Sequence, residues 1–273
     1  MMSDSHAMWR MDQRSLRTLT AVALILVAGC AGFGPSETPS ATPTGTPTPT
    51  DTPVPATPTD TATPDPSYPT GWSATGVENG TVAVDAHYRA VLTGPSATVR
   101  YRSREIDTGG ESANETTLGM AYETGTGRLY ASIVGTDGHR EVFLRNDTLS
   151  QWNVRDESLV GRSNARFHRV VQSIDRRVLL SQLLLYTLEH ERTVERNGTV
   201  AHVYNVTGVH DNTVSNTYGA GTDASGTLVV ATDGRVLELE TTVTYTGGTL
   251  RYRYVHTRLG ETTVETPAWV RTD

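Results

Sequence analysis

The 273-residue chain carries 23 basic and 30 acidic side chains, which gives a net charge of −7 at neutral pH. All of the basic residues are arginine, and the chain has a single cysteine. An acidic chain repels the phosphates of nucleic acid, so we expect no nucleic-acid partner. One cysteine cannot form a disulfide within the chain, so the fold must be held together by burial of its core.

The N-terminus has the layout of a secretion signal. Three arginines precede an apolar run from Leu19 to Val27 that is broken by a single threonine. A charged segment followed by a short apolar one is typical of a secretory signal peptide. The run is also shorter than the roughly 20 apolar residues that a membrane-spanning helix needs. We therefore predict a signal peptide over residues 1–29.

The segment Val27-Ala28-Gly29-Cys30 resembles the lipobox of prokaryotic lipoproteins. The resemblance implies cleavage before Cys30 and attachment of a diacylglyceryl-type lipid to its thiol. It also implies a location on the extracytoplasmic face of the cell membrane, with the membrane as a partner through the lipidated Cys30. The alternative is an ordinary cleaved signal followed by an unmodified cysteine.

A linker follows the cysteine. Residues 34–69 are almost entirely Ser, Thr, Pro, Asp and Ala, and they hold eleven of the thirteen prolines. Such a composition cannot bury a core, and Thr-Pro repetition favours an extended polyproline conformation. We predict a Thr/Pro-rich linker over residues 30–70 and a folded domain over residues 71–273. Threonine beside proline also suits O-glycosylation, with a passive spacer as the alternative.

The folded domain is predicted to contain two helices among many strands. One helix is expected at 82–92, because Val84 and Tyr88 fall on the same face. A Leu-rich segment, 173–189, is apolar on nearly every side and predicts a second, buried helix. Alternating patterns bounded by glycine, asparagine and aspartate turns predict antiparallel strands, and a polar loop is expected at 209–221. The strands are expected at 98–106, 117–123, 128–135, 140–145, 150–155, 192–195, 199–206, 226–231, 235–246 and 249–259.

The order of these parts resembles a known family. A lipobox, a Thr/Pro spacer, a first helix, a strand meander, a Leu-rich helix and hairpin-linked strands ending in residues 259–269 resemble a haloarchaeal lipoprotein family of unknown function. The layout is also similar to bacterial lipoprotein carriers and mycobacterial lipid-binding lipoproteins. This second likeness is one of architecture. It implies an α+β fold, in which a curved antiparallel β-sheet forms a half-barrel, helices pack on its concave face, and an apolar cavity lies between them.

The sequence favours a binding protein over an enzyme. It shows no catalytic motif, no metal-ligand spacing and no cofactor fingerprint. The segment Glu189-His190-Glu191 is the nearest approach to a metal-ligand cluster, and it is interpreted as a solvated helix end. The architecture predicts binding of a lipid or other apolar ligand. The alternative is a glycosylated cell-surface structural or interaction protein with no small-molecule ligand. The ligand-lining residues are expected to be Leu180, Leu184, Leu239, Val243 and Tyr245.

Two further sets of residues invite a functional interpretation. Arginines alternate along one predicted strand at Arg100, Arg102 and Arg104, and again at Arg251 and Arg253. They suit an anionic headgroup, but a solvated edge of arginines that pair with acidic neighbours is the favoured interpretation. Five Asn-x-Thr sequons are N-glycosylation acceptors, and those in predicted turns, at positions 146 and 197, are the strongest. The acceptors are Asn79, Asn114, Asn146, Asn197 and Asn205.

Overall fold

The computed structural model describes residues 67–196, 198–210, 214–215 and 218–270, which lie in one compact unit, Thr61–Asp273. The predicted signal peptide, Cys30, nearly all of the predicted linker and Asn197 lie outside the described residues. Among the helices that are described, none is long and apolar enough to cross a membrane.

The first strands form an antiparallel meander. Before them, a two-stranded ribbon of β1 (Trp72–Ser73) and β2 (Gly76–Val77) precedes the first helix. The meander consists of β3 (Ala97–Asp107), β4 (Ser112–Glu123), β5 (Arg128–Gly135), β6 (Gly138–Arg145), β7 (Thr148–Asn153) and β8 (Ser158–Asn164).

The second group of strands completes the sheet. It consists of β9 (Tyr186–Arg196), β10 (Thr199–Val209), the short β11 (Val214–Ser215), β12 (Gly219–Ala231), β13 (Val236–Tyr245) and β14 (Gly248–Thr257). A 3₁₀ turn, η1 (Ala268–Val270), follows near the C-terminus.

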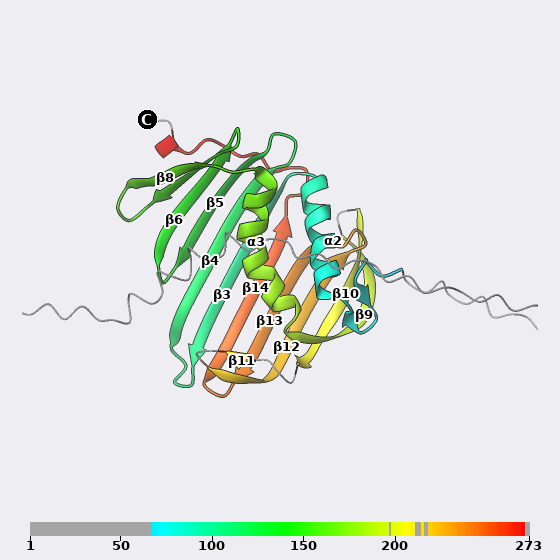
Figure 1. The fold of residues 1–273 in the computed structure, drawn as a ribbon. Helices are drawn as coiled ribbons and strands as arrows, with labels where there is room; N and C mark the ends of the chain where they lie inside the picture. Colours follow the sequence, from blue (N-terminus) through cyan, green and yellow to red (C-terminus); the bar gives the residue numbers. More distant parts are fainter. Residues whose placement is uncertain (1–66, 197, 211–213, 216–217, 271–273) are drawn as a thin grey trace, which may run out of the picture. The chain divides into compact units, whose positions relative to one another are not determined.

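The strands join into one open antiparallel sheet in the order β8-β7-β6-β5-β4-β3-β14-β13-β12-β10-β9, with β11 paired to β12 (Figure 1). The chain starts in the middle of this sheet at β3, runs outward to β8, and returns from the opposite edge at β9. Pairing of β14 with β3 joins the two halves, with Tyr254 opposite Tyr101. Strands that are distant in sequence therefore lie side by side at the centre.

Two helices pack on the concave face of the sheet: α2 (Gly80–Thr93) and α3 (Phe167–Leu183) (Figure 1). The helix α2 begins two residues before the predicted 82, because the side-chain oxygen of Asn79 accepts a hydrogen bond from the Val82 amide at 3.1 Å and so caps its first turn. Its apolar side, including Val84 and Tyr88, is buried. The predicted fold class, an α+β half-barrel with helices on the concave face, is confirmed.

The second helix was predicted wrongly in its bounds. It begins six residues earlier than the predicted 173 and ends at Leu183, and the residues from Tyr186 onward belong to β9. The Leu-rich stretch joins the last helical turn to an alternating strand, in which Tyr186 and Leu188 are buried. The helical spacing of apolar residues before Leu183 and the strand alternation after it, read as one segment, predicted a single helix that was apolar on every side.

The core lies mainly between the helices and the concave face. Inward side chains of the central strands are fully buried there, among them Val99, Met120, Leu239 and Val243. A smaller cluster lies on the opposite face of the sheet and consists of Ala201, Val203, Val229, Ala231 and Leu237. The helices therefore cover one face of the sheet, and much of the other face is left to polar side chains.

Candidate ligand-binding face

The burial of inward side chains on the concave face decreases along the central strands. Under the helices the inward positions are closed, as at Val99 and Met120. The hairpin end of β3 and β4 extends beyond both helices (Figure 1), and there the inward positions are only half-buried. We call this region the open concave patch. It consists of Tyr101, Ser103 and Glu105 on β3, Ile133 on β5, and Leu250 on β14.

Pairing across the sheet places these side chains together. Leu118 on β4 lies opposite Tyr101 on one side and Ile133 on the other. Leu250 lies opposite Glu105. Inward positions on neighbouring strands are about 5 Å apart, so the apolar members form a continuous wall that ends at a carboxylate.

Tyrosine side chains surround this wall. The rings of Tyr101 and Tyr252 lie 5.1 Å apart, and those of Tyr218 and Tyr245 lie 6.4 Å apart. The Tyr186 hydroxyl donates to Gln182 Oε1 at 2.6 Å and lies 2.6 Å from Thr241 Oγ1. The end of α3 is thereby fixed to β13.

Burial raises the pKa of these phenols, so they stay neutral over a wider pH range. Loss of solvent raises the pKa of Tyr245 above its ordinary value, and the charge of Glu105 raises it further. The pKa of Tyr218 is raised by the same two causes, burial first. Burial also raises the pKa of Tyr101 and of Tyr186. Their protonated hydroxyls are hydrogen-bond donors, so the patch combines apolar area, neutral donors and one carboxylate.

The four expected lining residues whose side chains the structure describes occupy different environments. Leu239 and Val243 are each 0% exposed in the closed core. Tyr245 is buried at the border of the open concave patch. Leu184 follows the last residue of α3, is 51% exposed, and packs against Gly80 at the start of α2. The side chain of Leu180 lies outside the described residues.

No sequence motif marked Tyr101, Glu105, Ile133 or Leu250. A signal for them exists in the strand alternation, since each occupies an inward position of its strand. Their exposure has no such signal, because it depends on where the helices end.

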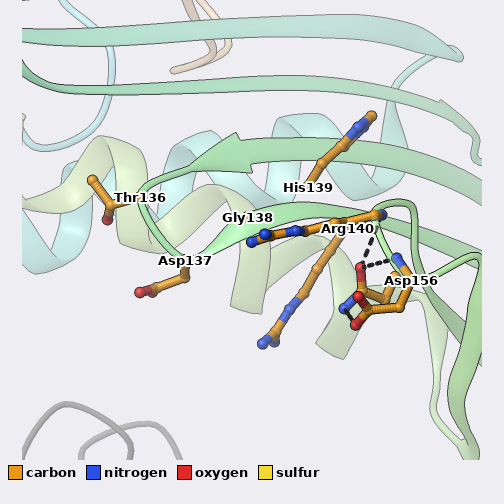
Figure 2. Close-up of a pocket in the computed structure, with 8 residues that line it drawn as sticks. Thr136, Asp137, Gly138, His139, Arg140 and Asp156 are labelled. Atoms are coloured by element: carbon orange, nitrogen blue, oxygen red, sulfur yellow. Dashed lines mark hydrogen bonds between the residues drawn. The ribbon is translucent and has the colours of Figure 1, made fainter. Parts of the chain in front are cut away.

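A polar hollow lies at the turn between β5 and β6. It has a volume of about 400 Å³ (Figure 2) and is lined by Thr136, Asp137, Gly138, His139, Arg140, Asn153, Arg155 and Asp156. Asn153 Oδ1 accepts hydrogen bonds from the backbone amides of Arg155 and Asp156, and its amide donates to Asp156 Oδ2 at 2.7 Å. These groups satisfy one another and stabilise the turn after β7, so the hollow is a less attractive ligand site.

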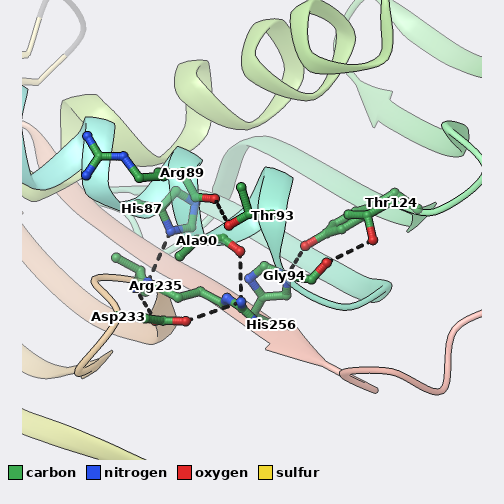
Figure 3. Close-up of polar contacts among 11 residues, drawn as sticks. His87, Arg89, Ala90, Thr93, Gly94, Thr124, Asp233, Arg235 and His256 are labelled. Carbon is green, nitrogen blue, oxygen red and sulfur yellow. Dashed lines mark hydrogen bonds and ion pairs between the residues drawn. The ribbon is translucent and has the colours of Figure 1, made fainter.

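A buried polar network holds α2 onto the sheet (Figure 3). Arg235 Nη2 donates to the Ala90 carbonyl at 2.8 Å, and His87 Nδ1 accepts from the Val236 amide at 3.1 Å. Tyr122 on β4 and His256 on β14 hydrogen-bond at 2.7 Å across the intervening β3. These contacts join the helix to the strands, so the network is structural.

A histidine pair lies on β9 and β10. His202 Nδ1 lies 3.2 Å from His190 Nε2, and the ring of Tyr68 packs against both. The segment Glu189-His190-Glu191 is therefore part of a strand, and its interpretation as a helix end was wrong. Within the described ranges there is no group of three or more His, Cys, Asp or Glu side chains that could hold a metal ion.

Stability is expected to fall in mild acid because of His202. Burial lowers the pKa of His202, and the neighbouring His190 lowers it further. Below an unfolded pKa of about 6.5 the unfolded chain therefore binds more protons than the folded one, so the free energy of unfolding falls as the pH falls. His202→Gln should flatten this dependence in denaturant titrations between about pH 7.5 and pH 5.

The control for this prediction is His168→Gln, since His168 is exposed at the surface. That variant should keep the slope of the parent protein. If His202→Gln also keeps the parent slope, burial of His202 does not contribute to the acid sensitivity.

The sequons occupy varied environments. Asn146 is exposed in a hairpin turn with φ of 49°, and Asn205 is exposed on β10. Asn79 caps α2. Asn114 is half-buried, and its amide nitrogen, the atom that would carry a glycan, donates to a carboxylate on β3. Asn197 lies outside the described residues, and glycosylation of any sequon stays a prediction.

Neither a protein-family model nor a curated protein matches this sequence. Among solved structures, the chain is similar to the lipoprotein LppX of Mycobacterium tuberculosis, with 15% identity over 68% of this chain and 97% of that chain and a TM-score of 0.33. LprF of Mycobacterium bovis is 10% identical over 71% of this chain and 98% of that chain, with a TM-score of 0.34. A LolA superfamily protein of Nitrosomonas europaea is 10% identical over 74% of this chain and 99% of that chain, with a TM-score of 0.25.

The likeness to lipoprotein carriers and mycobacterial lipoproteins, predicted from the layout, is thus found among solved structures. With TM-scores below 0.5, these similarities carry no conclusion about the ligand of this chain. Membership of a haloarchaeal lipoprotein family stays a prediction.

Proposed function

We propose that this chain is a lipid-anchored protein of the extracytoplasmic membrane face that binds a lipid or other apolar molecule at the open concave patch. One observation carries the ligand-binding part of this proposal. Tyr101, Ile133 and Leu250 lie on the concave face, continuous with the core, yet they are only half-buried. The anchoring part rests on the lipobox ending at Cys30.

The chemistry of the patch suits an amphipathic molecule. An apolar chain that covers the wall is favoured by about 25 cal/mol per Å² of apolar surface removed from water. Ser103 and Glu105 border the wall, and the phenol of Tyr218 lies close to Glu105. Ligand sites commonly combine a mostly apolar lining with a few polar groups that fix orientation. The polar end of the ligand would therefore lie toward Glu105.

The second candidate function is that of a cell-surface interaction protein without a small-molecule ligand. The filled core beneath the helices favours it, since Leu239 and Val243 are fully buried by protein atoms alone. An exposed sequon at Asn146 agrees with a glycosylated exterior. The two functions differ in whether the open concave patch takes up an apolar probe.

Ile133→Asp is expected to weaken uptake of a fluorescent long-chain fatty acid by about tenfold or more, because the apolar chain would have to desolvate the new carboxylate. Fluorescence titration of the purified protein measures this directly. Circular dichroism and thermal unfolding confirm that the variant is folded.

Val134→Asp is the matched control. Val134 is the next residue on β5, faces the opposite side of the sheet, and is 41% exposed. It should bind the probe as the parent does. If Ile133→Asp and Val134→Asp bind the probe equally and saturably, the ligand lies elsewhere. If the parent protein shows no saturable binding, the cell-surface interaction function is favoured.

A further inference from the structure

The convex face of the sheet carries a concentration of arginines. We call the set formed by Arg100, Arg102, Arg104, Arg251 and Arg253 the arginine face. Strand alternation points these side chains away from the helices, because the residues between them, such as Tyr101 and Tyr252, belong to the concave core. The set lies on β3 and β14, which are central strands. As expected from the sequence, these arginines are solvated and several of them pair with acidic neighbours.

The arginines oppose one another across the strand pair. Arg104 lies directly opposite Arg251, and Arg102 lies directly opposite Arg253. Like charges at directly opposed positions destabilise a sheet unless anions compensate them. The side chains of Arg102 and Arg253 are 58% and 60% exposed, so an anion from outside can reach them.

The acidic neighbours compensate only part of this charge. Glu115 accepts two hydrogen bonds from Arg102, at 3.0 and 3.1 Å, and lies 4.0 Å from Arg104. Glu240 lies 3.4 Å from Arg253. Arg251 forms no ion pair with any residue that the structure describes. The five arginines and the two glutamates that pair with them sum to a net charge of three positive, in a chain whose net charge is −7.

The same side chains enclose a hollow. It has a volume of about 170 Å³ and is lined by Arg102, Arg104, Glu240, Thr241, Thr242, Arg251, Tyr252 and Arg253. The side chains of Thr241 and Tyr252 are buried on the other face, so their backbone forms the floor. Arginines of both strands, β3 and β14, line it. Their fork of N–H donors matches the oxygens of a phosphate group.

We infer that the arginine face binds the phosphate of anionic phospholipid headgroups and so docks the convex side of the sheet on the membrane. Charge complementarity selects this occupant, since the face is a cationic region on an acidic chain. Attraction between exposed charges is short-ranged at physiological salt, with a screening length of about 8 Å. A tether to the same membrane compensates for this weakness by raising the effective concentration of headgroups. The docking face and the open concave patch lie on opposite sides of the sheet, so each can be tested without the other.

The chain itself provides a way to test this inference. Cys30 is the single cysteine, so a chain from Cys30 to Asp273, which contains the whole compact unit, can be coupled to vesicles that contain a maleimide lipid. One vesicle set is phosphatidylcholine, and the other also contains phosphatidylglycerol. Phenylglyoxal modification of each arginine, followed by peptide mass mapping, then measures its protection. We expect modification of Arg102 and Arg253 to be about fivefold slower on the phosphatidylglycerol vesicles, and this protection to be lost at high salt.

Two double variants with the same charge change provide the comparison. Arg104→Gln with Arg251→Gln should abolish the protection of Arg102 and Arg253. Arg145→Gln with Arg155→Gln removes two exposed arginines from other parts of the surface and should leave the protection intact. Circular dichroism verifies folding of both. Equal modification on the two vesicle sets, or equal sensitivity to both double variants, overturns the inference. A last comparison adds inorganic phosphate to the protein on pure phosphatidylcholine vesicles. If it protects Arg102 and Arg253 as much as phosphatidylglycerol does, the membrane is not the source of the phosphate.

Discussion

Arg235→Ala is expected to lower the free energy of unfolding by about 2–4 kcal/mol, through the loss of a buried, charge-assisted hydrogen bond and through a residual cavity. Arg235 is 5% exposed, and its guanidinium donates to the Ala90 carbonyl at 2.8 Å, in the last turn of α2 (Figure 3). A cation at this position also interacts favourably with the helix C-terminus. Asp233, 3.3 Å away, is half-exposed, so this ion pair contributes less than the buried hydrogen bond. Chemical denaturation monitored by circular dichroism measures the loss.

The matched control is Arg196→Ala. Arg196 forms an ion pair with Glu238 at 2.6 Å, but its side chain is 48% exposed. Exposed ion pairs contribute about 0–1 kcal/mol, so this variant should be close to the parent. An effect of Arg235→Ala no larger than that of Arg196→Ala would show that the network does not hold α2 in place.

Local turn chemistry explains why the hairpins could be predicted. The turn at Asn146 and Asp147 uses left-handed backbone conformations, with φ of 49° and 57°, which asparagine and aspartate tolerate better than most residues. The strand β5 has the predicted bounds, because glycines mark both of its ends and its inward residues are apolar.

Elements without an apolar signal were missed. The strand β8 (Ser158–Asn164) is an edge strand with mostly exposed side chains, so nothing in its sequence marks an inward face. The first half of β12, from Gly219, is likewise polar. Its residues 219–221 were predicted to be part of a loop, and no strand was predicted before residue 226. Pairing with β13 defines that segment as a strand. Such pairing is a long-range property that local pattern does not reveal.

The candidate site could be predicted only in part, for the same reason. Alternation identified Leu239, Val243 and Tyr245 as inward residues, and the structure buries all three. Whether an inward residue is closed or open depends on the helix above it. Since α3 ends at Leu183 and both helices stop short of the end of β3, Tyr101 is left half-buried. Helix placement on a sheet depends on packing between distant segments, which a single sequence does not specify.

Cys30→Ser is expected to move nearly all of the protein from the membrane fraction to the soluble fraction, provided that the signal peptide is still removed. A thiol-linked lipid contributes about 0.8 kcal/mol per buried CH₂, so two long chains anchor a protein stably. The serine hydroxyl cannot take the place of the thiol. Ultracentrifugal fractionation of the source cells, with mass spectrometry of the released N-terminus, measures both location and cleavage. Ala31→Ser is the control, because it introduces the same side chain next to an intact thiol.

High salt distinguishes attachment through the lipid on Cys30 from attachment through the arginine face. Headgroup contacts contribute about 1 kcal/mol per basic residue near an anionic surface, so a net charge of three positive holds the protein far more weakly than two lipid chains do. Any Cys30→Ser protein left in the membrane fraction should therefore be released by high salt, whereas the parent should resist it. Full retention of the processed Cys30→Ser protein in high salt would show that the thiol is not the anchor. Because electrostatic contacts would also be screened under those conditions, an apolar contact of the folded domain with the membrane would then have to hold it.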